Sequence, residues 1–152
     1  MADETEMSSI GAQLDALIPK ILDDIIRENR DKAELRLATE EEVCALFTTL
    51  KPGPVKQRID DWYFINLHIK PLSQSQLILL GYLKGEGLPW ITSVVTGIDL
   101  KNHLVTTRSG SIYAIGNRGK EEEPDSQLLA TVCAVMHKWG MGTFLGVPPW
   151  FF

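Results

Sequence analysis

Residues 90–116 read WITSVVTGIDLKNHLVTTRSGSIYAIG. Threonine, valine and isoleucine dominate positions 91–98, and these residue types favour β-strands. Positions 99–103 form a mostly polar interruption of hairpin length. The strand pattern returns over 104–115, with a second turn at the Ser-Gly-Ser triplet 109–111. This stretch therefore predicts two or three strands that double back on one another.

Further strands are predicted upstream of this stretch. Residues 62–70 alternate, so that Tyr, Ile, Leu and Ile at the odd positions share one face. Residues 77–83 are a nearly continuous apolar run, which is typical of a central strand. The Gly-Glu-Gly triplet 85–87 predicts the turn that follows it, and Leu-Arg-Leu at 35–37 predicts a short edge strand.

Three segments have helical patterns. Residues 10–26 carry an apolar stripe, in which Pro19 either kinks the helix or begins a second one. Thr39 and Glu42 form a capping-box pair, which predicts a helix from there to about residue 51. A third helix is predicted from Asp125 or Ser126 to the glycine at 140.

Together these elements predict an α+β fold. We expect a mainly antiparallel β-sheet of four to five strands, with N-terminal helices and a C-terminal helix packed on it. The 152 residues fit a single domain, 1–152, in which 1–7 are expected to be disordered.

Composition narrows the class of protein. Hydrophobic residues make up 44% and charged residues 23%, which are ordinary values for a soluble globular protein. No run of about 18 apolar residues occurs, so a membrane-spanning helix is excluded. The acidic start of the chain is unlike a secretory signal, and we expect a cytoplasmic protein. Cys44 and Cys133 lie in apolar helical patterns and are expected to be buried free thiols.

Charge is distributed unevenly along the chain. Residues 1–50 contain twelve acidic and five basic residues, a net charge of −7, whereas residues 51–152 contain eight and ten, a net charge of +2. The acidic residues 1–50 disfavour binding to a phosphate backbone and favour binding to a basic surface. A solvated helix face would have the same charge pattern.

No motif predicts a catalytic, metal or cofactor site. His68, His103 and His137 are far apart, and neither cysteine has the spacing of a zinc ligand pair. The Ser-Gly-Ser triplet lacks the pattern around a nucleophilic serine, and no glycine-rich stretch has P-loop spacing. We therefore expect no cofactor, no metal and no enzymatic activity.

The C-terminal tail, residues 144–152, reads FLGVPPWFF. Its two prolines forbid a helix. The tail either packs over the sheet as part of the core or forms an apolar patch that binds a partner or a second copy of the chain.

Three blocks resemble a pattern found in small uncharacterised bacterial proteins: TSVV at 92–95, Ile98-Asp99, and VTTRSGSIY at 105–113. Many of these proteins are similar to products of phages, prophages and other mobile elements. The resemblance covers about a quarter of the chain, and the block mostly encodes a hairpin. It implies a setting in which small acidic proteins inhibit a defence complex or neutralise a toxin.

The main hypothesis is a non-enzymatic protein–protein interaction protein, an anti-CRISPR-like inhibitor of a bacterial defence complex. Its acidic helices would occupy a basic groove in competition with nucleic acid, and aromatic side chains would anchor the contact. The candidate partner-binding residues are Asp15, Asp23, Asp24, Glu28, Glu40, Glu41, Glu42, Trp62, Trp150 and Phe151.

Three alternatives remain open. The chain could be an immunity protein that neutralises a cognate toxin. It could be a small nucleic-acid-binding regulator that uses the Lys101 to Arg108 hairpin, although the turns there carry few basic residues and only Tyr113 as an aromatic neighbour. It could also be an enzyme, which would require His68, Asp99 and Arg108 to converge in one pocket.

Overall fold

A computed structural model describes residues 20–51 and 53–147. Predictions for the first helix before residue 20, for residues 1–7, for Asp15 and for the tail residues Trp150 and Phe151 lie outside the described residues. The elements, in chain order, are η1 (Leu22–Ile26), β1 (Ala33–Leu37), α2 (Glu40–Cys44), β2 (Val55–Ile69), η2 (Lys70–Leu72), β3 (Gln74–Leu83), β4 (Pro89–Asp99), β5 (Leu104–Thr107), β6 (Ile112–Ile115) and α3 (Ser126–Lys138).

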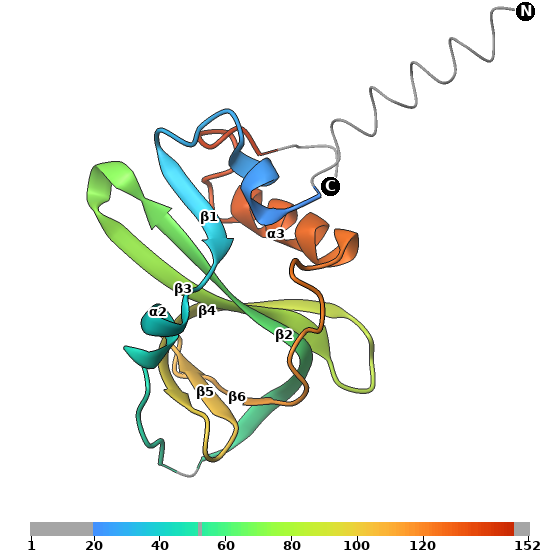
Figure 1. The fold of residues 1–152 in the computed structure, drawn as a ribbon. Helices are drawn as coiled ribbons and strands as arrows, with labels where there is room; N and C mark the ends of the chain where they lie inside the picture. The colour runs from blue at the N-terminus through green and yellow to red at the C-terminus, as the bar shows by residue number, and fades with distance from the viewer. Residues whose placement is uncertain (1–19, 52, 148–152) are drawn as a thin grey trace, which may run out of the picture.

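The strands form one sheet in the order of the chain, β1 to β6, and consecutive strands pair antiparallel. The last strand, β6, also pairs in parallel with the first half of β2, from Val55↔Ile112 to Ile59↔Ile115. Strands β2 to β6 therefore close on one another, and Figure 1 shows this closed sheet in the lower half of the molecule. Strand β1 pairs only with the second half of β2.

A β-bulge bends β2 between these two halves. Asp60 pairs with Tyr82 and Tyr63 pairs with Leu80, so two residues of β2 lie opposite Gly81 alone. Asp61 in the bulge has a φ of 50°, in the left-handed region. A Cβ at Gly81 would lie 2.8 Å from the carbonyl oxygen of Asp60, so only glycine fits beneath the bulge.

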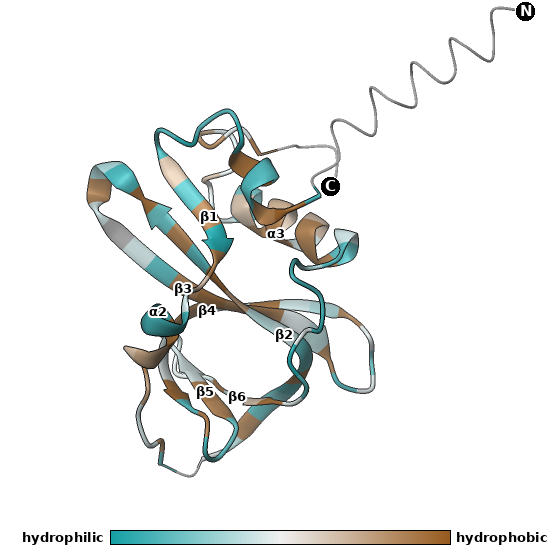
Figure 2. Cartoon of the chain, viewed as in Figure 1, coloured by the Kyte–Doolittle hydropathy of each residue, from teal (hydrophilic) through white to brown (hydrophobic). Residues whose placement is uncertain are grey.

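The bend gives the molecule two hydrophobic cores. The first lies between the outer part of the sheet, η1 and α3, and includes Ile65 and Leu67 of β2. The second fills the closed sheet and includes Ile59 and Phe64, also of β2. Figure 2 shows strongly hydrophobic residues where the long strands cross at the middle of the molecule, whereas α2 is hydrophilic.

Helix α3 covers the first core. The Asp125 carboxylate accepts a hydrogen bond of 2.9 Å from the Leu128 N–H and so caps the helix, as the sequence predicts. Its buried residues are Leu128, Leu129, Val132, Cys133 and Met136. No helix within residues 20–51 and 53–147 is long and apolar enough to cross a membrane.

The structure confirms the α+β class and the mostly antiparallel sheet, and it corrects the details. Over residues 20–51 and 53–147 the sheet has six strands rather than four to five, and β2 begins at Val55 rather than Trp62. The described part of the first predicted helix is the five-residue 3-10 helix η1.

The second predicted helix ends at Cys44, well before residue 51. The segment that follows is held instead by strand β4. Leu46 O accepts from the Ile98 N–H, and Thr48 N–H donates to Ile98 O, each at 2.9 Å. The Leu50 N–H donates to the Asp99 carboxylate at 3.0 Å. Backbone pairing with β4 therefore competes successfully with continuation of the helix.

The two cysteines differ in exposure. Cys133 is buried in α3, as predicted, and burial raises the pKa of its thiol to about 12. Cys44 is a free thiol, as predicted, but its predicted burial is wrong, because α2 buries none of its residues and this thiol is exposed.

Candidate interaction surface

The acidic residues around η1 are partly engaged with neighbouring groups. Asp23 forms an ion pair with Arg30, and Asp24 accepts a hydrogen bond of 3.1 Å from the Lys20 N–H. Glu28 follows η1 and is exposed. Because the positive charge of Arg30 offsets the negative charge of Asp23, the net negative charge on this surface is smaller than the acidic residues alone would give.

Three glutamates form the first turn of α2, and they have different roles. The Glu42 carboxylate accepts from the Thr39 N–H at 2.8 Å, which completes the predicted capping box, and from Arg36 at 2.7 and 3.1 Å. It also accepts a hydrogen bond from Asn66, which is buried in β2. Glu42 therefore fixes α2 to the sheet, whereas Glu40 and Glu41 are exposed.

This arrangement changes the acidity of Glu42. The hydrogen bonds from the Arg36 guanidinium favour the ionised carboxylate and lower its pKa to about 2, with a smaller contribution from Thr39. Desolvation opposes this change without reversing it.

An apolar groove of about 260 Å³ lies between α2 and the closed sheet. We call it the α2 groove. Phe47 and Leu100 keep 46% and 42% of their surface exposed, which is unusual for large apolar side chains that lie close to one another. The groove is lined by Ala38, Glu40, Val43, Cys44, Phe47, Trp62, Phe64, Leu100 and Arg118.

Trp62 is held firmly in the wall of this groove. Its indole N–H donates to Gly116 O at 3.0 Å, and its ring centroid lies 5.1 Å from that of Phe64. The Arg118 guanidinium lies 6.0 Å from the Trp62 ring centroid, in cation–π geometry. Trp62 therefore presents a fixed apolar surface, which costs less conformational entropy on binding than a mobile side chain.

Among the predicted partner-binding residues, the structure brings Glu40 and Trp62 to one groove and places Asp23, Asp24 and Glu28 elsewhere. Sequence reasoning missed the exposed residues. Phe47 reads as a core position of a longer helix, and it becomes exposed because that helix stops at Cys44. Leu100 is the one apolar residue in the turn at 99–103, and that contrast is a signal that the sequence does offer.

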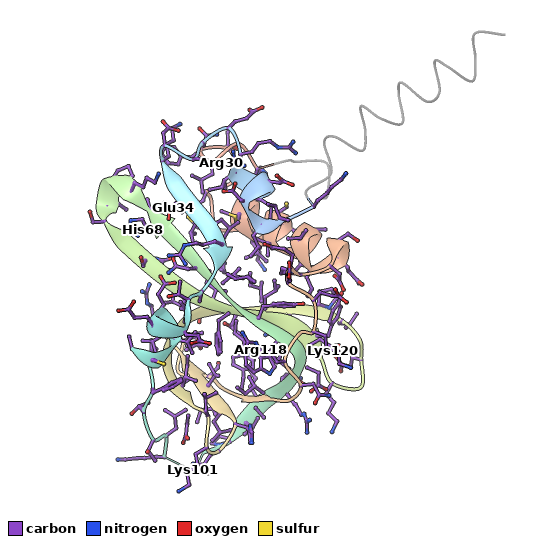
Figure 3. The ribbon with its side chains drawn as sticks, viewed as in Figure 1. Arg30, Glu34, His68, Lys101, Arg118 and Lys120 are labelled. Atoms are coloured by element: carbon purple, nitrogen blue, oxygen red, sulfur yellow. The ribbon has the colours of Figure 1, made fainter. Side chains whose placement is uncertain are left out.

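The residues of the enzyme alternative do not all converge. The His68 ring contacts the Ser75 hydroxyl at 2.7 Å near the tip of the β2–β3 hairpin. The Asp99 carboxylate is occupied by the Leu50 N–H and by the side chain and N–H of Asn102. Figure 3 shows His68 and Lys101, which closely follows Asp99 in the chain, at opposite ends of the molecule.

The ordering of the 99–103 turn depends on Asp99. The Asn102 amide and the Leu50 N–H hold the pKa of its carboxyl below the ordinary value.

Within residues 20–51 and 53–147, no group of three or more His, Cys, Asp or Glu side chains is arranged to hold a metal ion.

Comparison of the chain with protein-family models, with curated proteins and with solved structures gives no significant match. The function must therefore be argued from the geometry of this surface.

Proposed function

We propose that this protein acts by binding another protein in the α2 groove, without catalysing a reaction. One observation carries the proposal: Phe47, Leu100 and Trp62 gather exposed or half-buried apolar surface in one groove. Aromatic residues in such grooves provide much of the binding energy of protein interfaces. Covering Phe47 and Leu100 would bury apolar surface that water now contacts.

The charges at the two sides of the groove indicate the chemistry of the partner. Glu40 lies in the lining and Glu41 beside it, and neither has an ion-pair partner among the described residues. Arg118 lies on the other side, against Trp62. A partner segment with an apolar side chain for the groove and a basic residue next to it would complement this surface.

We further propose that the partner is a basic, nucleic-acid-binding complex of a bacterial defence system, which the protein inhibits in the cytoplasm. The resemblance of residues 92–113 to mobile-element proteins supports this setting. Glu40 and Glu41 then provide most of the acidic contacts with this partner, because Glu42 and Asp23 form ion pairs within the chain. An immunity protein with a toxin as partner would use the same groove.

Site-specific crosslinking can test the proposal, since the Cys44 thiol is exposed in the groove. A photoreactive maleimide on Cys44 should crosslink one host protein, which mass spectrometry then identifies. A control protein carries Cys44→Ser and Leu72→Cys, which moves the probe to an exposed site on η2. This control should not capture the same protein.

The captured partner must then depend on the groove. Phe47→Asp should weaken its binding by about tenfold or more, whereas Leu72→Asp should change it less than twofold. Equal binding by both variants would show that the α2 groove is not the interface.

A further inference from the structure

A second pocket, separate from the α2 groove, lies on the outer surface of the closed sheet. It is an open pocket of about 330 Å³, formed by β2, β6 and the turn at 99–103. Its polar lining comes from Arg58, Asn102, His103 and Asn117, and Gly116 forms part of its wall. We call it the Arg58 pocket.

The side chains of the Arg58 pocket offer hydrogen-bond donors. Arg58 uses its Nε atom to bind Asp60 at 3.3 Å, and its two Nη atoms have no partner among the described residues. The side chains of His103 and Asn117 are exposed and likewise have no partner there. Free guanidinium, imidazole and amide donors are the groups with which proteins bind phosphate oxygens.

The carboxylates beside the pocket, Asp60 and Asp99, are already occupied, and Asp99 accepts from the Asn102 side chain at 2.9 Å. Asp60 Oδ1 accepts from Arg58 Nε and from the Asn117 N–H, each at 3.3 Å. A Cβ at Gly116 would collide with Asp60 Oδ1 and with Arg58 Nη2, so the absence of a side chain at 116 lets these groups lie against the backbone. Asp60 therefore orients Arg58 while leaving its outer nitrogens available.

The surroundings of the pocket are basic. Lys84 N–H donates to Arg58 O at 2.9 Å, which places Lys84 next to Arg58. Lys101 and Arg118 adjoin lining residues in the chain, and all three cations are exposed. The Arg118 guanidinium lies over the Trp62 ring in the α2 groove, so it acts on the Arg58 pocket only through its charge. None of the three forms an ion pair within the described residues. The positive charge here is thus less neutralised than the negative charge around β1 and η1.

We propose that the Arg58 pocket binds a phosphate group, carried by a nucleic-acid strand or by a free nucleotide. The two outer nitrogens of Arg58 hold the phosphate oxygens in a bidentate contact, and His103 and Asn117 donate from the sides. Lys84, Lys101 and Arg118 raise the local concentration of the anion, which makes binding sensitive to salt.

The direct test follows backbone amide signals by NMR during titration with inorganic phosphate, against sodium chloride at equal ionic strength. Phosphate should shift the signals of His103, Gly116 and Asn117, and chloride should not. Arg58→Gln should weaken phosphate binding about tenfold. Arg108→Gln removes the same charge from an exposed site outside the pocket and should change binding less than twofold.

A second variant removes a donor from the pocket at a position where the fold should not be affected. His103 has a φ of 56°, which glycine adopts freely, so His103→Gly removes the ring without straining the turn. This variant should weaken phosphate binding several-fold while its thermal unfolding stays close to that of the original chain. Equal losses in Arg58→Gln and Arg108→Gln would overturn the proposal, because binding would then depend on net charge alone.

Competition distinguishes the sources of the phosphate. If a mononucleotide and a single-stranded oligonucleotide displace phosphate equally well, the pocket is assigned to free nucleotides. Tighter, salt-dependent binding of the oligonucleotide would assign it to a strand. A polyglutamate peptide that binds as tightly as the oligonucleotide would overturn the proposal and indicate a carboxylate-rich protein partner.

Discussion

At the scale of single residues, Glu42 connects three parts of the molecule. Its carboxylate caps α2 through Thr39, pairs with Arg36 of β1 and accepts from Asn66 of β2. Losing it would leave the buried Asn66 amide without its acceptor and would remove two hydrogen bonds from Arg36, which still donates to Leu37 O. Unsatisfied polar groups are costly. The candidate groove depends on this residue although Glu42 does not line it.

We predict that Glu42→Gln lowers the free energy of unfolding by about 1–2 kcal/mol at pH 7. The pKa of Glu42 is lowered to about 2 in the folded chain, below its ordinary value of 4.5. The stabilisation is therefore present above about pH 4.5 and is lost as the pH falls towards 2. Urea unfolding of both proteins at several pH values checks this, and the difference between them should shrink in acid.

Glu41→Gln is the matched control, because Glu41 lies in the same turn of α2 and its side chain has no partner among the described residues. It should change stability by less than about 0.5 kcal/mol. A loss equal to that of Glu42→Gln would mean that the charge of the helix start, rather than the contacts of Glu42, stabilises the fold.

The two thiols should differ in reactivity. Burial raises the pKa of Cys133 to about 12, so almost none of it is thiolate at pH 8, while Cys44 is exposed. A chromogenic thiol reagent should modify one cysteine per folded chain and two in denaturant. Cys44→Ser should abolish the rapid reaction, and two rapid equivalents in the native protein would contradict the burial of Cys133.

At the scale of elements, the bulge in β2 decides the architecture. It turns the strand so that its first half pairs with β6 and its second half with β1. Gly81 makes the bend possible because it leaves room for the backbone of Asp60 and Trp62.

Gly81→Ala should therefore destabilise the protein by about 2–3 kcal/mol, since the added methyl group overpacks a site bounded by backbone atoms. Chemical denaturation measures this change. Asp61→Gly in the same bulge should cost little or stabilise slightly, because glycine tolerates a φ of 50°. Similar large losses in both variants would mean that the bulge is stabilised by side-chain contacts of Asp61 instead.

At the scale of the whole molecule, two cores share β2 and β3. Leu80 of β3 lies in the first core and Leu79 in the second, and residues of β2 divide between the cores in the same way. Neither core can lose its strands without exposing the other, so the two should unfold together.

This predicts a single cooperative transition in urea. The far-ultraviolet circular dichroism signal reports the secondary structure, which includes α3 above the first core. The near-ultraviolet signal reports the packing of the aromatic side chains, which include Trp62 and Trp90 against the second core. The two curves should coincide. Leu129→Ala removes buried side-chain atoms from the first core and Val105→Ala from the second, and each variant should shift its two curves by the same amount. The free energy of unfolding should fall by about 2–4 kcal/mol for Leu129→Ala and by somewhat less for Val105→Ala. Separate midpoints would show that the cores unfold independently.

Much of the fold could be predicted from local patterns. Residues close in sequence produce four of these patterns: the alternation in β2 after Trp62, the apolar run of β3, the turns around β5, and the caps of α2 and α3. The start of β2 could not be predicted, because Val55 to Arg58 are exposed and only Ile59 is buried there. That segment becomes a strand through its distant partner β6, and pairing of this kind has no local signature.

The candidate site was harder to predict for the same reason. The α2 groove combines positions 38–47, 62–64, 100 and 118, which only the closed sheet brings together. Of these, Glu40, Trp62 and Leu100 carry a sequence signal, namely charge in a helix start, an aromatic residue in a strand and an apolar residue in a polar turn. Phe47 depends on where a helix stops, and Arg118 depends on the bend at the bulge.

The parallel pairing of β6 with β2 also bears on how the chain is made. During synthesis, Val55 to Arg58 leave the ribosome more than fifty residues before Ile112, and β6 is their partner in the finished sheet. Until then these residues lack the neighbouring strand β6, and contacts between positions so far apart form slowly. A nascent chain arrested before Ile112 would therefore present an open strand edge to other chains, and completion of β6 removes that hazard.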